Sequence, residues 1–337
     1  MINFQTGLFR AASAALALAF LFTVSTPVEA NPDRWRLQGW SKTDFSKKSI
    51  DFKDVLSGGP PKDGIPSIDN PKFVPVADIT GLVDTEPVVS LEIDGDARAY
   101  PFQILMWHEI INDVIGGTPI VVTYCPLCNS AVVFDRRLDG KLLEFGTTGK
   151  LRKSNLIMYD RQTESWWQQF VGVGIVGKYT DRTLETFPAR IEAFGKFKAR
   201  HGKGKVLVPN DESMRQYGRN PYAGYDTAAT PFLYSGDMPE GINPMARVVA
   251  FKVDGKPQAV TIELLRKKGK LELGNIEISW QKGQNSALDT SRIAKGRDVG
   301  NVVVQRKSAG GTEDILYDVT FAFVFYAFFP KQPIIDS

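Results

Sequence analysis

The sequence predicts an exported, mainly β protein of the α+β class, built from two related halves. Three observations lead to this prediction: strand-like segments separated by Asp-Gly turns, an apolar N-terminal segment, and stretches of sequence that recur about 160 residues apart. The composition is globular, since 43% of the 337 residues are hydrophobic and 23% are charged. The net charge of +3 is too small to indicate nucleic-acid binding.

The first thirty residues have the pattern of a secretory signal peptide. Arg10 provides a positive charge, Ala11–Val24 is an apolar run, and small residues at Val28 and Ala30 suit a cleavage site. An uncleaved membrane anchor is the alternative, but the run is shorter than the roughly 20 residues that a bilayer-spanning helix needs. We therefore expect a mature chain that begins near Asn31, is periplasmic or secreted, and has no stable membrane span after cleavage.

Residues 31–86 contain many Pro and Gly turn signals and predict an ordered but irregular lead segment. The pattern then becomes regular. Val88–Ile93 alternates as a strand does, Asp94-Gly95 is typical of a hairpin turn, and Ala97–Tyr100 begins the return strand. Because proline is favoured in the first turn of a helix, we expect a helix over Pro101–Ile115 that ends at two glycines.

Three stretches of the chain recur in the same order farther along it. Val88–Leu105 shares six identical positions with Val248–Leu265, 160 residues later, including the Asp-Gly turn. Two further pairs match at similar separations: Ile120–Ala131 with Ile276–Ala287, and Ile157–Asp160 with Ile315–Asp318. These matches predict an internal duplication. We place the first repeat with its connection at residues 87–246, and a degenerate second repeat at residues 247–337.

Both cysteines of the chain lie in the first repeat and have no counterpart in the second. Cys125 and Cys128 correspond to Gln281 and Gln284, so the second copy of the loop is expected to fold without a cysteine pair. A purely structural disulfide is therefore the less favoured interpretation. Two intervening residues allow a loop to present both sulfurs on one side, where they can bind a soft metal or exchange with a disulfide.

Two thiolates form only half of a tetrahedral metal site, so further ligands are needed. His108 is the best third ligand, because it lies at the flank of the predicted helix and falls opposite Lys268 in the second copy. Glu109, Met158 and Asp160 are weaker additions. The alternative for His108 is a helix histidine whose hydrogen bonds are satisfied by its neighbours.

A dense group of polar residues beside two tryptophans occupies residues 154–169. This mixture suits a pocket with apolar walls and a few oriented polar groups. We expect Asp160 and Arg161 to be the catalytic residues that orient a substrate, and three neighbours to bind it: Thr163, Trp166 and Gln168. The alternative is an Asp-Arg turn followed by a strand with core aromatic residues.

Four motifs are distinctive in combination: Trp107–Glu109, Thr123–Ala131, Tyr159–Trp166 and Tyr217–Tyr225. On these motifs the chain resembles a bacterial family called domain of unknown function 3179 (DUF3179), over roughly Asp63–Phe251. The resemblance implies that six residues form one constellation: His108, Cys125, Cys128, Asp160, Arg161 and Trp166. It implies neither a substrate nor a cofactor.

Three functions fit the sequence. The first is a copper or zinc site formed by Cys125, Cys128 and His108, which would carry the metal or use it in catalysis. The second is periplasmic thiol–disulfide exchange by the two cysteines. The third is a small-ligand binding module in which Trp166 and Trp167 line the pocket and the cysteines form a static disulfide. The expected partner is thus a metal ion or a small molecule, with no nucleic acid.

Overall fold

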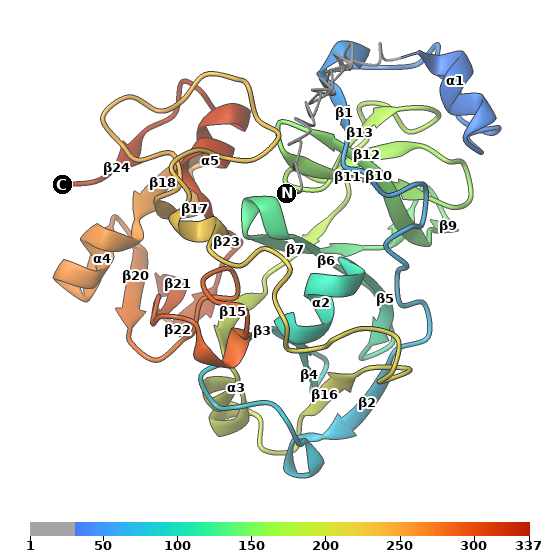
Figure 1. The fold of residues 1–337 in the computed structure, drawn as a ribbon. Helices are drawn as coiled ribbons and strands as arrows, with labels where there is room; N and C mark the ends of the chain where they lie inside the picture. Colours follow the sequence, from blue (N-terminus) through green and yellow to red (C-terminus); the bar gives the residue numbers. More distant parts are fainter. Residues whose placement is uncertain (1–30) are drawn as a thin grey trace, which may run out of the picture.

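The structure is a computed structural model that describes residues 31–337, so the predicted signal peptide lies outside the described residues. The described part is mainly β, and its larger sheets have a propeller-like arrangement (Figure 1). Within residues 31–337, no helix is both long enough and apolar enough to cross a bilayer.

Two sheets belong largely to the first half of the chain and position the cysteine loop. The strand order of one is β1 (Val55–Ser57), β10 (Phe145–Arg152), β11 (Asn155–Asp160), β12 (Trp166–Gln168) and β13 (Val173–Val176). The order of the other is β14 (Thr186–Phe187), β7 (Ser130–Asp135), β6 (Thr118–Cys125) and β5 (Ile110–Ile115). A small ribbon of β8 (Arg137–Leu138) and β9 (Lys141–Leu142) connects them along the chain.

Three further sheets complete the structure. The third sheet has the order β15 (Arg190–Ala193), β3 (Pro87–Ile93), β4 (Asp96–Pro101), β16 (Lys205–Val208) and β2 (Lys72–Pro75). The fourth has the order β23 (Tyr317–Phe321), β17 (Arg247–Val253), β18 (Lys256–Thr261) and β24 (Ile334–Ile335). The fifth has the order β19 (Lys270–Leu273), β20 (Ile276–Gln281), β21 (Asn301–Ser308) and β22 (Gly311–Asp314).

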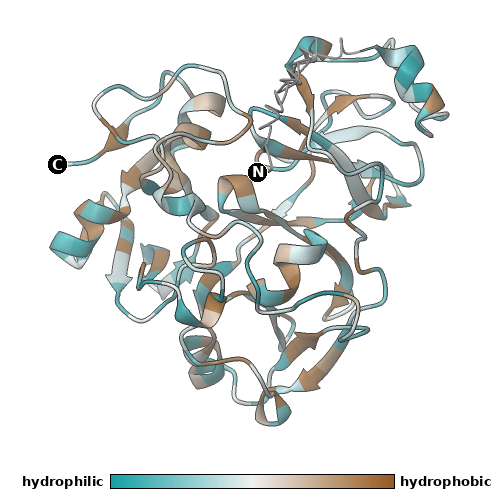
Figure 2. Ribbon diagram, in the orientation of Figure 1, coloured by the Kyte–Doolittle hydropathy of each residue, from teal (hydrophilic) through white to brown (hydrophobic). Residues whose placement is uncertain are grey.

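The helices are short, with six or seven residues each: α1 (Pro32–Leu37), α2 (Phe102–His108), α3 (Phe194–Arg200), α4 (Ile262–Lys268) and α5 (Ala322–Phe328). Figure 2 shows that apolar residues concentrate in the strands, whereas α4 is largely hydrophilic. One core cluster includes side chains of both halves, among them Tyr124 and Phe321. The two halves therefore share a core.

The predicted hairpin after the lead segment is confirmed. β3 pairs with β4 in antiparallel register from Val88↔Pro101 to Ile93↔Asp96. Asp94 and Gly95 have φ values of 49° and 80°, as a two-residue hairpin turn with two left-handed positions requires.

The predicted helix is shorter than expected, and the prediction for its second part was wrong. α2 ends at His108, and Ile110–Ile115 forms β5, which pairs with β6. Glu109 ends the helix because its φ of 57° lies outside the right-handed region. The β-branched residues that follow favour a strand, and Gly116 and Gly117 form its hairpin turn.

The order of elements is the same in two parts of the chain. β3–β4–α2–β5–β6 is matched by β17–β18–α4–β19–β20, and β16 and β24 pair in parallel with β4 and β18, respectively. The third sequence match does not join equivalent elements, because Ile157–Asp160 lies in β11 between β10 and β12, whereas Asp318 lies in β23 beside β17.

The lead segment packs on the sheet that contains β11 and β12. Trp35, Trp40 and Phe45 are buried there, and their rings contact Trp166 at centroid distances of 4.9, 5.1 and 5.5 Å, respectively. The irregular segment is therefore integral to the fold, because it covers the aromatic side of that sheet.

Candidate functional site

The cysteine loop is a tight turn between two buried strands. β6 ends at Cys125, Pro126–Cys128 forms a 3-10 turn, and β7 begins at Ser130. Proline suits the first position of the turn, and Asn129 takes the left-handed conformation that ends it, with a φ of 49°. Both thiols are free, and the exposed fractions of Cys125 and Cys128 are 1% and 0%.

The two sulfurs face the same short segment, Ser154–Leu156. The Cys125 and Cys128 sulfurs lie 3.7 and 3.4 Å from the Ser154 carbonyl oxygen, to which both thiols donate. The side-chain amide of Asn155 donates to the Cys128 sulfur at 3.3 Å. Burial and the neighbouring Cys125 raise the pKa of the Cys128 thiol well above its usual range. Cys128 is therefore a protonated thiol at neutral pH.

His108 does not join the cysteines. Its Nδ1 donates to the Pro66 carbonyl at 2.8 Å, so its Nε2 accepts from the Tyr217 hydroxyl, also at 2.8 Å. Burial lowers the pKa of the imidazole, which favours this neutral form. In the part of the chain that the structure describes, no group of three or more His, Cys, Asp or Glu side chains is placed to hold a metal ion. The structure thus brings the two sulfurs together without the expected third ligand.

Asp160 and Arg161 lie in separate polar networks. The buried Asp160 carboxylate accepts from the backbone and hydroxyl of Thr163, at 2.7 and 2.8 Å, and from Trp167 Nε1 at 3.0 Å. Burial nevertheless raises its pKa. Arg161 is partly exposed and forms ion pairs with three acidic side chains: Asp63, Asp69 and Glu144. The pair therefore does not converge on one substrate position.

The three predicted substrate-binding residues also separate. Trp166 is fully buried in the aromatic core formed with the lead segment. The Thr163 hydroxyl is used by Asp160 and Ser165. Gln168 is different, because it lines a cavity.

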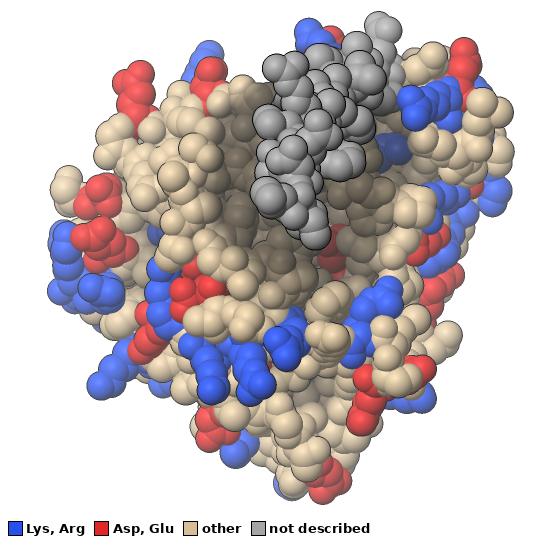
Figure 3. Space-filling model, viewed as in Figure 1, with Lys and Arg blue, Asp and Glu red and all other residues tan. Residues whose placement is uncertain are grey.

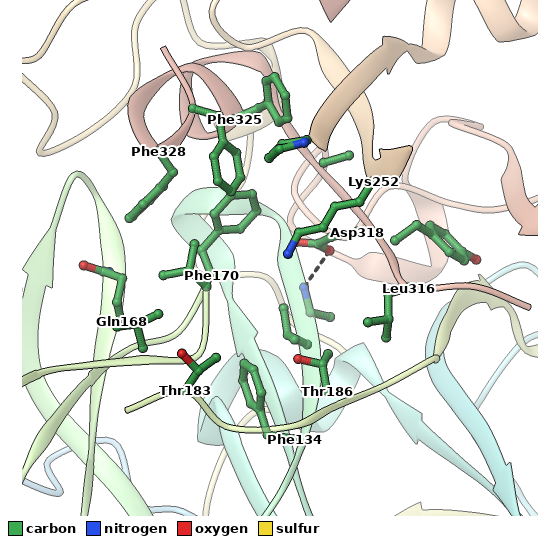
Figure 4. A pocket seen from close by; sticks show the side chains of 18 of the residues that line it. Phe134, Gln168, Phe170, Thr183, Thr186, Lys252, Leu316, Asp318, Phe325 and Phe328 are labelled. Atoms are coloured by element: carbon green, nitrogen blue, oxygen red, sulfur yellow. Dashed lines mark hydrogen bonds between the residues drawn. The ribbon is translucent and has the colours of Figure 1, made fainter. Parts of the chain in front are cut away.

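This cavity has a volume of about 650 Å³ and lies between the two halves of the chain (Figure 4). Its walls are mostly apolar and include seven phenylalanines: Phe134, Phe170 and Phe187 from the first half, and Phe251, Phe325, Phe328 and Phe329 from the second. Figure 4 shows Phe170, Phe325 and Phe328 gathered on one side, with Lys252 extending across the cavity toward Asp318. The size and lining are those of a site for a small organic molecule.

Asp318 and Lys252 are the charged groups at the centre of the cavity. The Asp318 carboxylate accepts from the Ser130 hydroxyl and, at 3.1 Å, from the Ala131 backbone amide. Burial raises the pKa of Asp318 to about 7, so a substantial fraction is uncharged at neutral pH. Lys252 is exposed and forms no ion pair within 4.0 Å with any carboxylate of residues 31–337.

A chain of buried amides joins the cysteines to the cavity wall. Asn155, which donates to the Cys128 sulfur, accepts from the side-chain amide of Gln168 at 2.7 Å. Asn155 also donates to Gln169 at 2.8 Å. Since Gln168 lines the cavity, a change at Cys128 can reach the cavity through two hydrogen-bonded side chains.

Glu109 is a buried acid, which from the sequence is expected only as an additional metal ligand. Its exposed fraction is 6%, no other residue in the described range donates a hydrogen bond to its carboxyl group, and burial raises its pKa to about 8. Its φ and ψ are 57° and −29°, and the matching position after α4 is Gly269, with φ and ψ of 70° and −35°. Alignment of the two halves could have revealed this unusual position, since a glutamate stands in the first half where the second half has a glycine.

A family model described as "Protein of unknown function (DUF3179)" matches residues 62–332. No curated protein and no solved structure matches the chain. The matched region covers most of the chain, including the cysteine loop, Gln168 and Asp318. The chain therefore belongs to the DUF3179 family.

Proposed function

We propose that the protein binds a small, largely apolar molecule with one anionic group in the cavity between its halves. The observation that carries this proposal is the cavity of about 650 Å³ with phenylalanine walls. Burying an apolar ligand surface there is favourable by about 25 cal/mol per Å². The few polar groups in the walls would orient the ligand.

The charges around the cavity support an anionic ligand rather than a cationic one. Lys252 reaches across the cavity, and Arg152 and Lys153 also lie in its walls. The main opposing group, Asp318, takes up a proton near neutral pH because its pKa is about 7. A carboxylate close to Lys252 would therefore be attracted more than it is repelled.

The cysteine pair supports a second candidate, a reversible dithiol. Both sulfurs approach one carbonyl oxygen, that of Ser154, and the two cysteine side chains interact with each other, which supports a disulfide between them. Oxidation would require an external acceptor of two electrons and two protons, such as a disulfide. The donor set supports this candidate better than the copper or zinc proposal, because the His108 nitrogens are used elsewhere.

The proposal also includes the cellular location of the protein and its evolutionary origin. Export to the periplasm or cell exterior rests on the signal-like residues 1–30. An internal duplication is supported by the matching order β3–β4–α2–β5–β6 and β17–β18–α4–β19–β20. In this proposal, the second copy supplies Lys252, Asp318 and α5 to complete a ligand site against the first copy.

Calorimetric titration with decanoate tests the proposed function. We expect saturable binding to the wild type. Phe170→Ala should weaken it about tenfold, since a large aromatic contact is lost, and Lys252→Gln should weaken it about fivefold through loss of charge. Lys256→Gln changes an exposed lysine at the start of β18 and is the matched control, which should bind as the wild type does.

No saturable binding to the wild type would contradict the proposal, and so would equal losses in Lys252→Gln and Lys256→Gln. The part of the cysteines in ligand binding is tested with Cys125→Ser and with the reduced and oxidised forms of the wild type. Cys125→Ser should leave decanoate binding unchanged if the cysteines only support the wall. A difference in affinity between the reduced and oxidised wild type would instead assign them a role in binding.

A further inference from the structure

Two arginines from distant parts of the chain are held side by side at a second cavity. The Asn220 amide donates to the Ser291 carbonyl, and the Ile293 amide donates to the Gly218 carbonyl, both at 3.1 Å. These bonds place Arg219 directly opposite Arg292 in an antiparallel bridge. The pair occupies a position without hydrogen bonds between the two residues themselves, where side chains emerge on the same side and lie closest together.

The positive charges of this pair are not compensated. Neither guanidinium group lies within 4.0 Å of any carboxylate of residues 31–337, and both side chains are exposed. Like charges directly opposite each other across a bridge are destabilising. Arg215, four residues before Arg219 along the chain, carries a further positive charge and helps to lower the pKa of His108. Figure 3 shows several Lys and Arg side chains, with Asp and Glu side chains among them, in the region of the orange segment of Figure 1.

A cavity of about 430 Å³ lies at the pair, with walls that include Gln103, Tyr217 and Gly218. It contains one acid, Glu86, whose exposed fraction is 1%. The Glu86 carboxylate is occupied, because it accepts from the Gln103 side-chain amide at 2.7 Å and from the Val83 backbone at 3.0 Å. Its pKa is raised by burial, which weakens its charge further. The charge that a ligand would meet in this cavity is therefore the positive charge of the two arginines.

We propose that Arg219 and Arg292 form a binding site for a small oxyanion, a phosphate or a carboxylate, separate from the phenylalanine-lined cavity. Guanidinium groups bind both kinds of anion through paired, parallel N–H···O bonds. An anion between the two side chains removes their mutual repulsion. The site also joins the first half to the second, so its occupation should stabilise the fold.

The test measures thermal unfolding and calorimetric binding of the whole protein with inorganic phosphate or malonate, at constant ionic strength set with chloride. We expect saturable binding and a raised Tm for one or both anions, and the comparison identifies which oxyanion is preferred. Arg219→Gln and Arg292→Gln should each weaken binding at least tenfold. Arg266→Gln removes an exposed arginine on α4 that has no ion pair in residues 31–337, and it should bind as the wild type does.

Arg219→Lys and Arg292→Lys separate geometry from charge, because lysine keeps the charge but loses the paired donors. A clear loss of affinity in these variants supports the site. Absence of saturable binding in the wild type would overturn the proposal. Equal weakening by Arg266→Gln and Arg219→Gln would also overturn it, since that result reflects overall charge.

Discussion

Glu109 has an unfavourable backbone conformation and an unfavourable side-chain environment at the same time. Its left-handed φ is disfavoured for a residue with a side chain, whereas Gly269 accepts the matching conformation readily. Its carboxyl group is buried without an ion pair among the described residues. Strain of this kind persists where the surrounding structure enforces it and is frequent at functional positions.

Glu109→Gln should make the protein more stable at high pH. Burial raises the pKa of Glu109 from 4.5 to about 8 in the folded state, so the folded protein binds more protons than the unfolded chain between these pH values. The wild type therefore loses stability as the pH rises from 4.5 to 8, by at most about 1.4 kcal/mol per pH unit from this group. Denaturant unfolding from pH 4 to 9 measures the difference.

The difference between Glu109→Gln and the wild type should be near zero at pH 4, grow up to pH 8 and then remain constant. A difference that is independent of pH would contradict the assignment. Glu109→Gly is the companion variant, since it removes the charge and the backbone strain together. It should exceed Glu109→Gln in stability by about 1 kcal/mol at every pH.

The buried thiols should react slowly in the folded protein. Alkylation requires a thiolate, and burial with a raised pKa keeps Cys128 protonated. We expect iodoacetamide to modify the reduced native protein at least roughly 100-fold more slowly than the urea-unfolded chain at pH 8. Mass spectrometry of timed samples measures both rates. Similar rates in the two states would show that the sulfurs are accessible.

The lead segment and β10 are held together at a glycine. Gly149 has a φ of 67°, and a Cβ atom placed there would lie 1.9 Å from the Pro60 carbonyl oxygen. Gly149→Ala should therefore destabilise the protein by at least about 2 kcal/mol, through the left-handed backbone and the collision. Denaturant unfolding measures this loss.

Gly140→Ala is the matched control, because Gly140 has a φ of 71° but nothing within 4 Å of its added Cβ. It should cost only about 1 kcal/mol, from the backbone alone. Equal losses in the two variants would mean that the lead segment moves away from β10 without cost.

Local sequence signals predicted the hairpins better than the helix. Asp94-Gly95 forms the predicted turn, and the same residue pair at Asp139-Gly140 turns the chain between β8 and β9, because these residues accept left-handed conformations. The helix over Pro101–Ile115 was overextended, because Phe102, Met106 and Ile110 fit a helical period although Ile110 begins a strand. The helix stop is at Glu109, a residue type that does not signal a left-handed position.

At the scale of the whole molecule, the sequence named Gln168, which lines the cavity, and placed Cys125 and Cys128 in one loop, but it did not predict the cavity itself. The phenylalanines that form its walls lie far apart along the chain, and apolar residues of this kind look like ordinary core in a sequence. Trp166 shows the converse, since it lies in the core although its polar neighbours suggested a pocket. A sequence does not separate aromatic residues that line a cavity from those that lie in the core, because this depends on how the two halves pack together.

The same limit applies to the charged residues. His108, Asp160 and Arg161 lie closer to the cysteines along the sequence than Asp318 does. Each of the three nevertheless interacts within its own polar network, apart from the cysteines. Asp318, in contrast, lies 190 residues beyond Cys128 and reaches the neighbouring Ser130 and Ala131 across the contact between β23 and β7. Sequence proximity is thus a poor guide to shared sites in this fold.

A crystal structure of the protein with decanoate tests the central claim, the ligand site between the halves, most directly. We predict electron density for the alkyl chain along Phe170, Phe325 and Phe328, with the carboxylate near Lys252. The cysteines should be no part of the contact surface. Density for decanoate only at other places, with the phenylalanine-lined cavity empty or filled by water, would contradict the account.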